Sequence, residues 1–95
     1  MGLGLEESLR LTVAALMQAT GDSQRAVASA LGLTQTQVSR RQSGATSWSL
    51  RDVDVLAEYY GVAGLDLLAG PTRACEALPD TRRRVTGVTE EGAVR

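Results

Sequence analysis

The sequence contains no histidine, no lysine and no phenylalanine, and its single cysteine is Cys75. One cysteine cannot form a disulfide within the chain, and this usage fits a reducing, cytoplasmic compartment. With so few nitrogen and sulfur ligands we expect no metal site, and we expect no cofactor. The same shortage leaves no set of groups for acid–base or nucleophilic chemistry, so we expect that the chain is not an enzyme.

Long apolar runs are also absent, since no run approaches the roughly 18 residues that a membrane span needs. The N-terminus carries Glu6 and Glu7 without an early basic region, unlike a signal peptide, so we expect no membrane association. Aromatic side chains are limited to one tryptophan and two tyrosines. A chain of 95 residues with this composition predicts one domain, whose small core is built from leucine, valine and alanine on short helices.

Apolar residues recur at three- and four-residue spacing between capping residues and glycines, which predicts an all-α fold. Thr34 with Gln37, and Ser49 with Asp52, each fit a capping box at a helix N-terminus. No segment alternates for long enough to predict a sheet. Five helices are expected, at about residues 6–20, 24–31, 35–43, 50–60 and 64–69.

The character of the chain changes after residue 70. Residues 1–70 are expected to form the compact domain. Residues 71–95 contain two prolines, mixed charge and few apolar residues at helical spacing, which predicts a polar, mobile tail or arm. Within it, the run Arg82-Arg83-Arg84 fits either a solvated charge run or an arm that adds phosphate contacts. No ligand domain follows residue 70, so we expect no small-molecule ligand.

The net charge is −1, which by itself argues against a nucleic-acid partner. The charge is unevenly distributed, however. Residues 22–48 carry three arginines and one aspartate, whereas residues 49–70 carry four acidic residues and one arginine. In a nucleic-acid-binding protein, phosphate would repel the acidic residues of the helix at 50–60, so these side chains would then be expected to point away from DNA: Asp52, Asp54 and Glu58.

The helix expected at 35–43 has only one strongly apolar residue, Val38. We therefore expect its polar side to be exposed, either as ordinary solvated surface or as a surface that contacts a partner. The helix expected at 24–31 precedes it across a tight break that contains Gly32, and the small residue Ala28 lies where the two helices approach. This is the geometry of a helix-turn-helix, whose second helix lies in the DNA major groove.

The stretch "SQRAVASALGLTQTQVSRRQSG" (residues 23–44), followed by "SLRDVDVLAEYYGV" (residues 49–62), resembles the phage-repressor and Cro-like, XRE-type helix-turn-helix family. The resemblance covers residues 5–69 and implies a lambda-repressor-like fold. It also implies a sequence-specific regulator that binds double-stranded DNA, most simply a small repressor of phage, plasmid or mobile-element type. Such a protein would act in the bacterial cytoplasm, at the nucleoid.

The resemblance and the polar side of the helix at 35–43 together suggest four base contacts: Gln35, Thr36, Ser39 and Arg40. Phosphate contacts are expected from the start of the helix at 24–31, from the arginine that follows Arg40 and from the polar loop at 45–49. These residues are Gln24, Arg25, Arg41, Thr46 and Ser47. One short helix contacts few base pairs, so a homodimer on two half-sites is expected. Val55 and Tyr59 are expected either to pack in a secondary core or to form a dimer contact together with Val62 and Leu65.

Several positions depart from the usual pattern of the family. Asp22 stands where an apolar residue usually packs, Trp48 where proline is common, and Ala63 where a serine usually caps the last helix. Gln42 and Met17 together replace a Glu–Arg pair, a double change that leaves no unpaired charge and so does not threaten the fold.

The near-neutral charge keeps a second function open. A helix-turn-helix can also serve as a protein-interaction module, antitoxin-like or polymerase-docking, here acting through the tail at 71–95. The two functions differ in salt dependence, because counterion release makes DNA binding fall steeply as salt rises.

Overall fold

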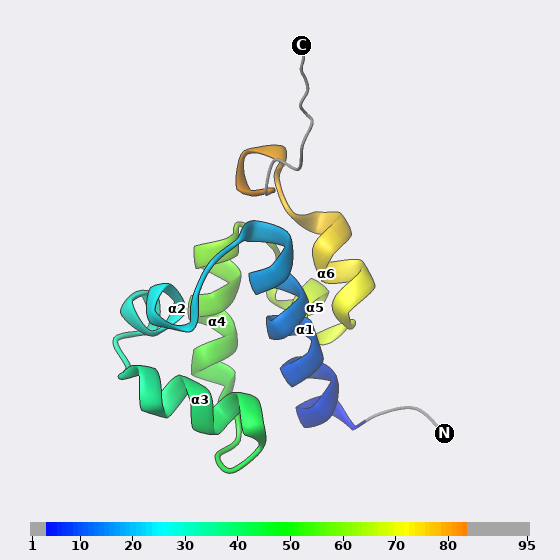
Figure 1. Cartoon of the computed structure of the whole chain (residues 1–95). Coiled ribbons are helices and arrows are strands. Elements are labelled where there is room, and N and C mark those ends of the chain that lie inside the picture. Colours follow the sequence, from blue (N-terminus) through cyan, green and yellow to red (C-terminus); the bar gives the residue numbers. More distant parts are fainter. Residues whose placement is uncertain (1–3, 84–95) are drawn as a thin grey trace.

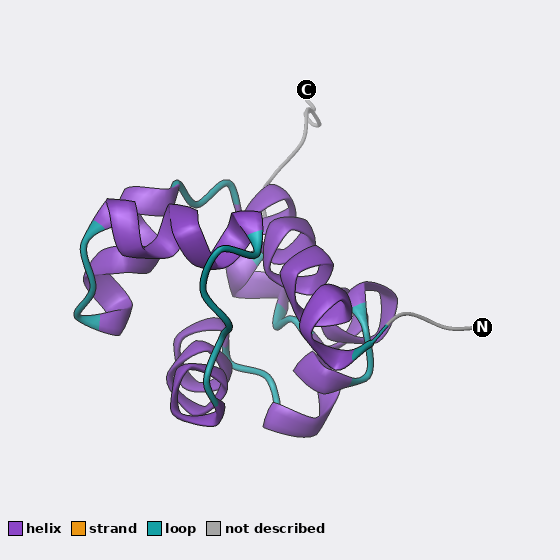
Figure 2. Ribbon diagram, turned by 90° about the horizontal axis from the view of Figure 1, so that it is seen from below, coloured by secondary structure: helices purple, strands orange, loops and turns teal. Residues whose placement is uncertain are grey.

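The computed structural model describes residues 4–83, and its regular structure is entirely helical (Figure 1). Within these residues there is no strand, as Figure 2 also shows. The predicted all-α helix-turn-helix fold is confirmed, and the first five helices begin and end within one residue of the predicted bounds. The elements are α1 (Leu5–Thr20), α2 (Gln24–Leu31), α3 (Gln35–Ser43), α4 (Leu50–Tyr60), α5 (Gly64–Leu68), α6 (Pro71–Ala77) and a 3₁₀-helix, η1 (Asp80–Arg82).

Side-chain caps fix where α2, α3 and α4 begin. Ser23 accepts a hydrogen bond from the backbone N–H of Ala26 at the start of α2. Both predicted capping boxes are present, at Thr34 for α3 and at Ser49 for α4. Each box satisfies two N–H groups that the helix itself leaves without a partner. No side chain caps α5, since Ala63 has no oxygen to offer.

The core is made mainly of aliphatic side chains from the α-helices, together with Trp48 and Tyr60. α1 runs through the centre of the molecule and contacts α3, α5 and α6, while α4 contacts α2 and α5 (Figure 1). This arrangement leaves α2 and α3 together on one side of the molecule, away from α6. The largest fully buried apolar side chains are Tyr60, Leu16, Leu56, Leu67, Val13, Val27 and Val38.

A sixth helix corrects the expectation of five helices followed by a mobile tail from residue 71. Pro71 occupies the first turn of α6, where proline fits because its missing N–H needs no partner. Ala74 is fully buried and Leu78 is 3% exposed, and α6 packs along α1. The proline and the polar residues favoured a tail, but two apolar residues four apart suffice when α1 offers them a surface. Residues 84–95 of the predicted tail lie outside the described residues.

Arg82 joins the end of the described chain to the turn between α1 and α2. Its Nη2 donates to Asp22 Oδ2 at 3.0 Å, and the hydroxyl of Tyr59 donates to the same oxygen at 3.0 Å. The guanidinium carbon also lies 4.8 Å from the centre of the Tyr59 ring. Burial and then the Asp22 carboxylate raise the pKa of Tyr59. An acidic residue at position 22 is therefore accommodated because Tyr59 and Arg82 both bind it.

The packing of α6 predicts a selective sensitivity at Ala74. An Ala74→Glu substitution would force a charged side chain into the contact with α1, so the free energy of unfolding should fall by more than about 2 kcal/mol. The control is Thr72→Glu, an exposed position of the same helix, which should change it by less than about 0.5 kcal/mol. Urea unfolding followed by circular dichroism measures both. Equal effects would show that α6 does not pack on the domain.

Candidate nucleic-acid interface

The α2–α3 pair is closed by a tight turn. Leu33 N–H donates to Ala28 O at 2.9 Å, and Gly32 N–H donates to Ser29 O at 3.3 Å. Gly32 has a φ of 70°, the left-handed conformation that glycine adopts without steric penalty. Ala28 is 4% exposed, so its small side chain lets the helices meet closely. The sequence-predicted helix-turn-helix geometry is thus formed by these residues.

The outward side of α3 carries the four residues expected to contact bases. All four are exposed, and within the described residues their side chains form no hydrogen bond or ion pair with the protein. α3 itself lies at the lower edge of the molecule (Figure 1). The four residues are Gln35, Thr36, Ser39 and Arg40. We call them the α3 outer face.

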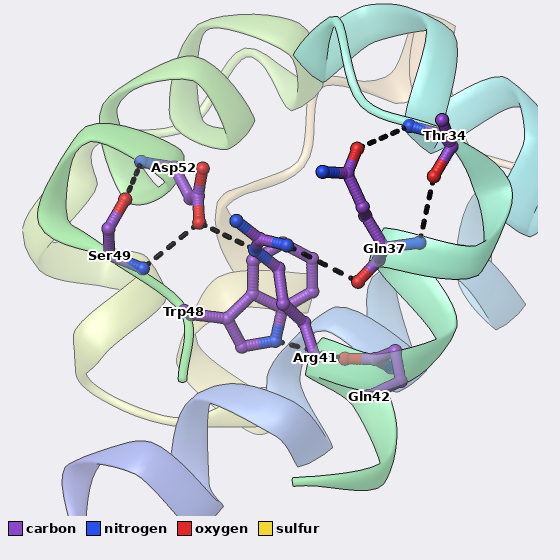
Figure 3. A network of polar contacts seen from close by, with 7 residues as sticks. All are labelled: Thr34, Gln37, Arg41, Gln42, Trp48, Ser49 and Asp52. Carbon is purple, nitrogen blue, oxygen red and sulfur yellow. Dashed lines mark hydrogen bonds and ion pairs between the residues drawn. The ribbon is translucent and has the colours of Figure 1, made fainter. Parts of the chain in front are cut away.

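The inward side of α3 is held by a single buried apolar residue, Val38, and by polar contacts around it. Arg41 Nε donates to Asp52 Oδ2 at 3.0 Å, and its Nη1 donates to Gln37 O at 3.3 Å. Figure 3 shows the guanidinium of Arg41 beside the Trp48 ring, with 5.9 Å between the guanidinium carbon and the ring centre. The side chains of Arg41 and Asp52 are only 16% and 12% exposed, respectively.

Asp52 therefore departs from the expectation that the acidic residues of α4 point away from the DNA-binding side. Its Oδ2 accepts from the backbone N–H of Ser49 at 3.0 Å, so the carboxylate caps α4 and pairs with Arg41 at once. Asp54 and Glu58 are exposed, as expected of a solvated face. Sequence reasoning recognised the capping box but not the ion pair, whose partners lie eleven residues apart on different helices.

Gln42 takes the place of the acidic residue usual in the family by bridging three segments. Its Nε2 donates to Arg10 O on α1 at 3.4 Å. Its Oε1 accepts from Trp48 Nε1 at 3.1 Å, which ties the loop before α4 to the end of α3 (Figure 3). Trp48 is 7% exposed despite its polar neighbours. A lone tryptophan in a polar loop was the signal that could have marked this anchor.

The candidate phosphate contacts fall into two groups. Gln24 is half-buried and borders a hollow shared with Met17 and Gln42, Arg25 is exposed, and Thr46 is half-buried. These three side chains have no hydrogen-bond partner among the described residues. The other two already bind acidic residues of the protein. Arg41 pairs with Asp52, and the Oγ of Ser47 donates to Glu6 Oε2 at 2.8 Å.

The structure does not bring the four candidate dimer contacts together. Val55 and Tyr59 border a hollow between α2 and α4, whereas Leu65 is 79% exposed beside α4 and α5. Val62 packs against the core. Leu65 instead shares its hollow with Leu50, which is 77% exposed and was not a sequence-based candidate.

Residues 4–83 hold neither a cluster of metal ligands nor a helix able to span a membrane. Within them, no three histidine, cysteine, aspartate or glutamate side chains cluster so that they could hold a metal ion. None of the helices in this part of the chain has the length and apolar character needed to cross a membrane.

The dependence of α3 on one buried side chain predicts the effect of Val38→Ala. Loss of two methyl groups from a fully buried position should lower the free energy of unfolding by about 2 kcal/mol. Thr36→Ala, on the α3 outer face, should change it by less than about 0.5 kcal/mol. Thermal unfolding of the two variants measures the difference. A Val38→Ala variant as stable as Thr36→Ala would contradict the burial of α3 through this residue.

A comparison with protein families matches the family described as "Helix-turn-helix domain" over residues 8–69. The match begins in α1 and ends at α5, so it contains the α2–α3 pair and the whole α3 outer face. A search of curated proteins and a search of solved structures each found no match. Because the family model matches most of this chain and α2 and α3 form a helix-turn-helix, the chain belongs to the helix-turn-helix domain family.

Proposed function

We propose that the chain is a sequence-specific regulator of transcription that binds double-stranded DNA with α3 in the major groove. The observation that carries the proposal is the α3 outer face. It consists of four exposed polar side chains on a helix whose opposite side is attached to the rest of the domain. Membership in the helix-turn-helix domain family supports the same conclusion. No catalytic role is proposed, and neither a cofactor nor a small-molecule ligand.

The side chains of the α3 outer face suit base contacts in the major groove. Arg40 has the paired donors that fit O6 and N7 of guanine. The amide of Gln35 fits N6 and N7 of adenine, and the methyl group of Thr36 fits the thymine methyl. Ser39 can donate to or accept from either kind of base edge.

Phosphate contacts would orient the domain on the duplex. Gln24 and Arg25 lie in the first turn of α2, and Thr46 lies in the loop after α3, so they would flank the inserted helix. Arg41 and Ser47 belong to this proposed set only if they exchange their partners Asp52 and Glu6 for phosphate.

We further propose that the protein acts as a homodimer on two half-sites, as a small repressor of phage, plasmid or mobile-element type in the bacterial cytoplasm. Nine residues of α3 span few base pairs, so a second copy would supply the remaining discrimination. Leu65 is the most exposed of the proposed dimer contacts, which also include Val55, Tyr59 and Val62.

A second candidate function is a protein-interaction module of the antitoxin-like or polymerase-docking kind. The observation that favours it is a group of exposed leucines at the ends of α1, α4 and α5. They border hollows lined by apolar side chains, and exposed apolar patches often mark protein contacts. The leucines are Leu5, Leu50 and Leu65.

Selection of bound duplexes from random DNA tests the proposed function. We expect a recovered motif, as an inverted repeat, whose preference relaxes at one position in an Arg40→Ala variant with a loss of about 1–3 kcal/mol in binding free energy. Arg73→Ala is the control, because Arg73 is an exposed arginine on α6 that pairs with Asp66 away from α3, and it should leave the motif unchanged. Recovery of no motif by the wild-type protein would contradict sequence-specific binding and favour the protein-interaction module.

A further inference from the structure

Arg40 and Arg41 are neighbours on α3 with opposite surroundings. Arg40 is exposed and has no ion-pair partner among the described residues. Arg41 is turned inward, with its Nε on Asp52 and its Nη1 on the carbonyl of Gln37. One arginine of the most positive stretch of the chain is thus neutralised within the fold.

We propose that Asp52 withholds Arg41 from the DNA backbone and so sets how many phosphate contacts the domain makes. Asp52 would be a positioning residue that keeps the sequence-independent part of DNA affinity low. The inference rests on the proposed DNA binding and adds a control on it that lies outside the α3 outer face.

The geometry makes the Arg41–Asp52 pair hard to exchange. Asp52 Oδ2 accepts from the Ser49 backbone N–H as part of the α4 cap, so the carboxylate cannot follow Arg41 outward without losing the cap. Trp48 lies against the guanidinium, and both charged side chains are largely covered. Charge-assisted hydrogen bonds of this kind are stronger than neutral ones and less screened by salt when partly buried.

Release of Arg41 would have a measurable signature. Its backbone position on α3 lies next to Arg40, so a freed side chain could extend toward a phosphate of any sequence. Each additional phosphate contact steepens the slope of log affinity against log salt by about 0.9. Between 50 and 200 mM salt that corresponds to a further loss of affinity of roughly threefold.

The test compares the salt dependence of DNA binding in Asp52→Asn with that in Asp54→Asn. The amide oxygen of asparagine can still accept from Ser49 N–H, so α4 remains capped, while Arg41 loses its anionic partner and keeps at most a weaker, neutral hydrogen bond to that oxygen. Asp54→Asn removes the same charge from an exposed position of the same helix. We expect tighter binding at low salt and a slope steeper by about 0.9 for Asp52→Asn relative to Asp54→Asn, on random and selected duplexes alike.

Arg41→Gln supplies a second measurement that does not depend on Asp52. If Arg41 makes no phosphate contact in the wild-type protein, its slope should stay at the wild-type value, and adding Arg41→Gln to Asp52→Asn should abolish the steeper slope. Equal slopes for the two aspartate variants would overturn the inference. A shallower slope for Arg41→Gln alone would overturn it too, because Arg41 would then already contact phosphate.

These outcomes are distinct from failure of the proposed function. A wild-type protein that binds no duplex at low salt would overturn DNA binding itself, and the inference with it. A wild-type protein that binds DNA while Asp52→Asn behaves like Asp54→Asn would overturn the role of Asp52 alone. Circular dichroism of each variant establishes that the helical fold is retained.

Discussion

The attachment of α3 to the rest of the domain is the constraint on which the structure depends. A nine-residue helix with one buried side chain cannot be held by apolar packing alone. Val38 supplies the apolar contact, Arg41 joins the helix to α4 through Asp52, and Gln42 joins it to α1 and Trp48. Because all three attachments lie on the inner side, the outer side can remain polar and unpaired.

The charged side chains are likewise divided, with paired, partly buried arginines and an exposed arginine on α3 that has no ion-pair partner among the described residues. The chain is close to neutral overall, yet its arginines have different roles according to their partners. Arg82 binds Asp22 beneath the turn that leads into α2, Arg41 binds Asp52, and Arg40 is left to solvent. A nearly neutral protein can therefore still present a positive group where DNA is proposed to approach.

Features that depend on neighbouring residues were predictable from the sequence. The capping boxes at Thr34 and Ser49 each need only two residues three apart, and the five helix boundaries follow from such local signals. The exposure of the α3 outer face followed from the isolation of Val38. Contacts between distant residues were not predictable: Arg82 and Asp22 are sixty residues apart, and no local pattern marks such a pair.

The sixth helix was likewise not predictable from local sequence signals. Ala74 and Leu78 carry too weak a periodic signal to predict α6, and their burial becomes favourable through the surfaces that α1 and α5 offer. The position of Leu65 away from Val55 and Tyr59 likewise depends on how α5 is placed by the core.

We propose that α3 and its flanking residues form the surface that meets DNA. The most direct measurement is an NMR titration of the full chain with a duplex recovered by selection, following the backbone amides. We expect the largest shifts in α3, at the start of α2 and in the loop at 44–49, with α5 and α6 little changed. Largest shifts around Leu5, Leu50 and Leu65 instead would contradict it and place the binding surface on the leucine side.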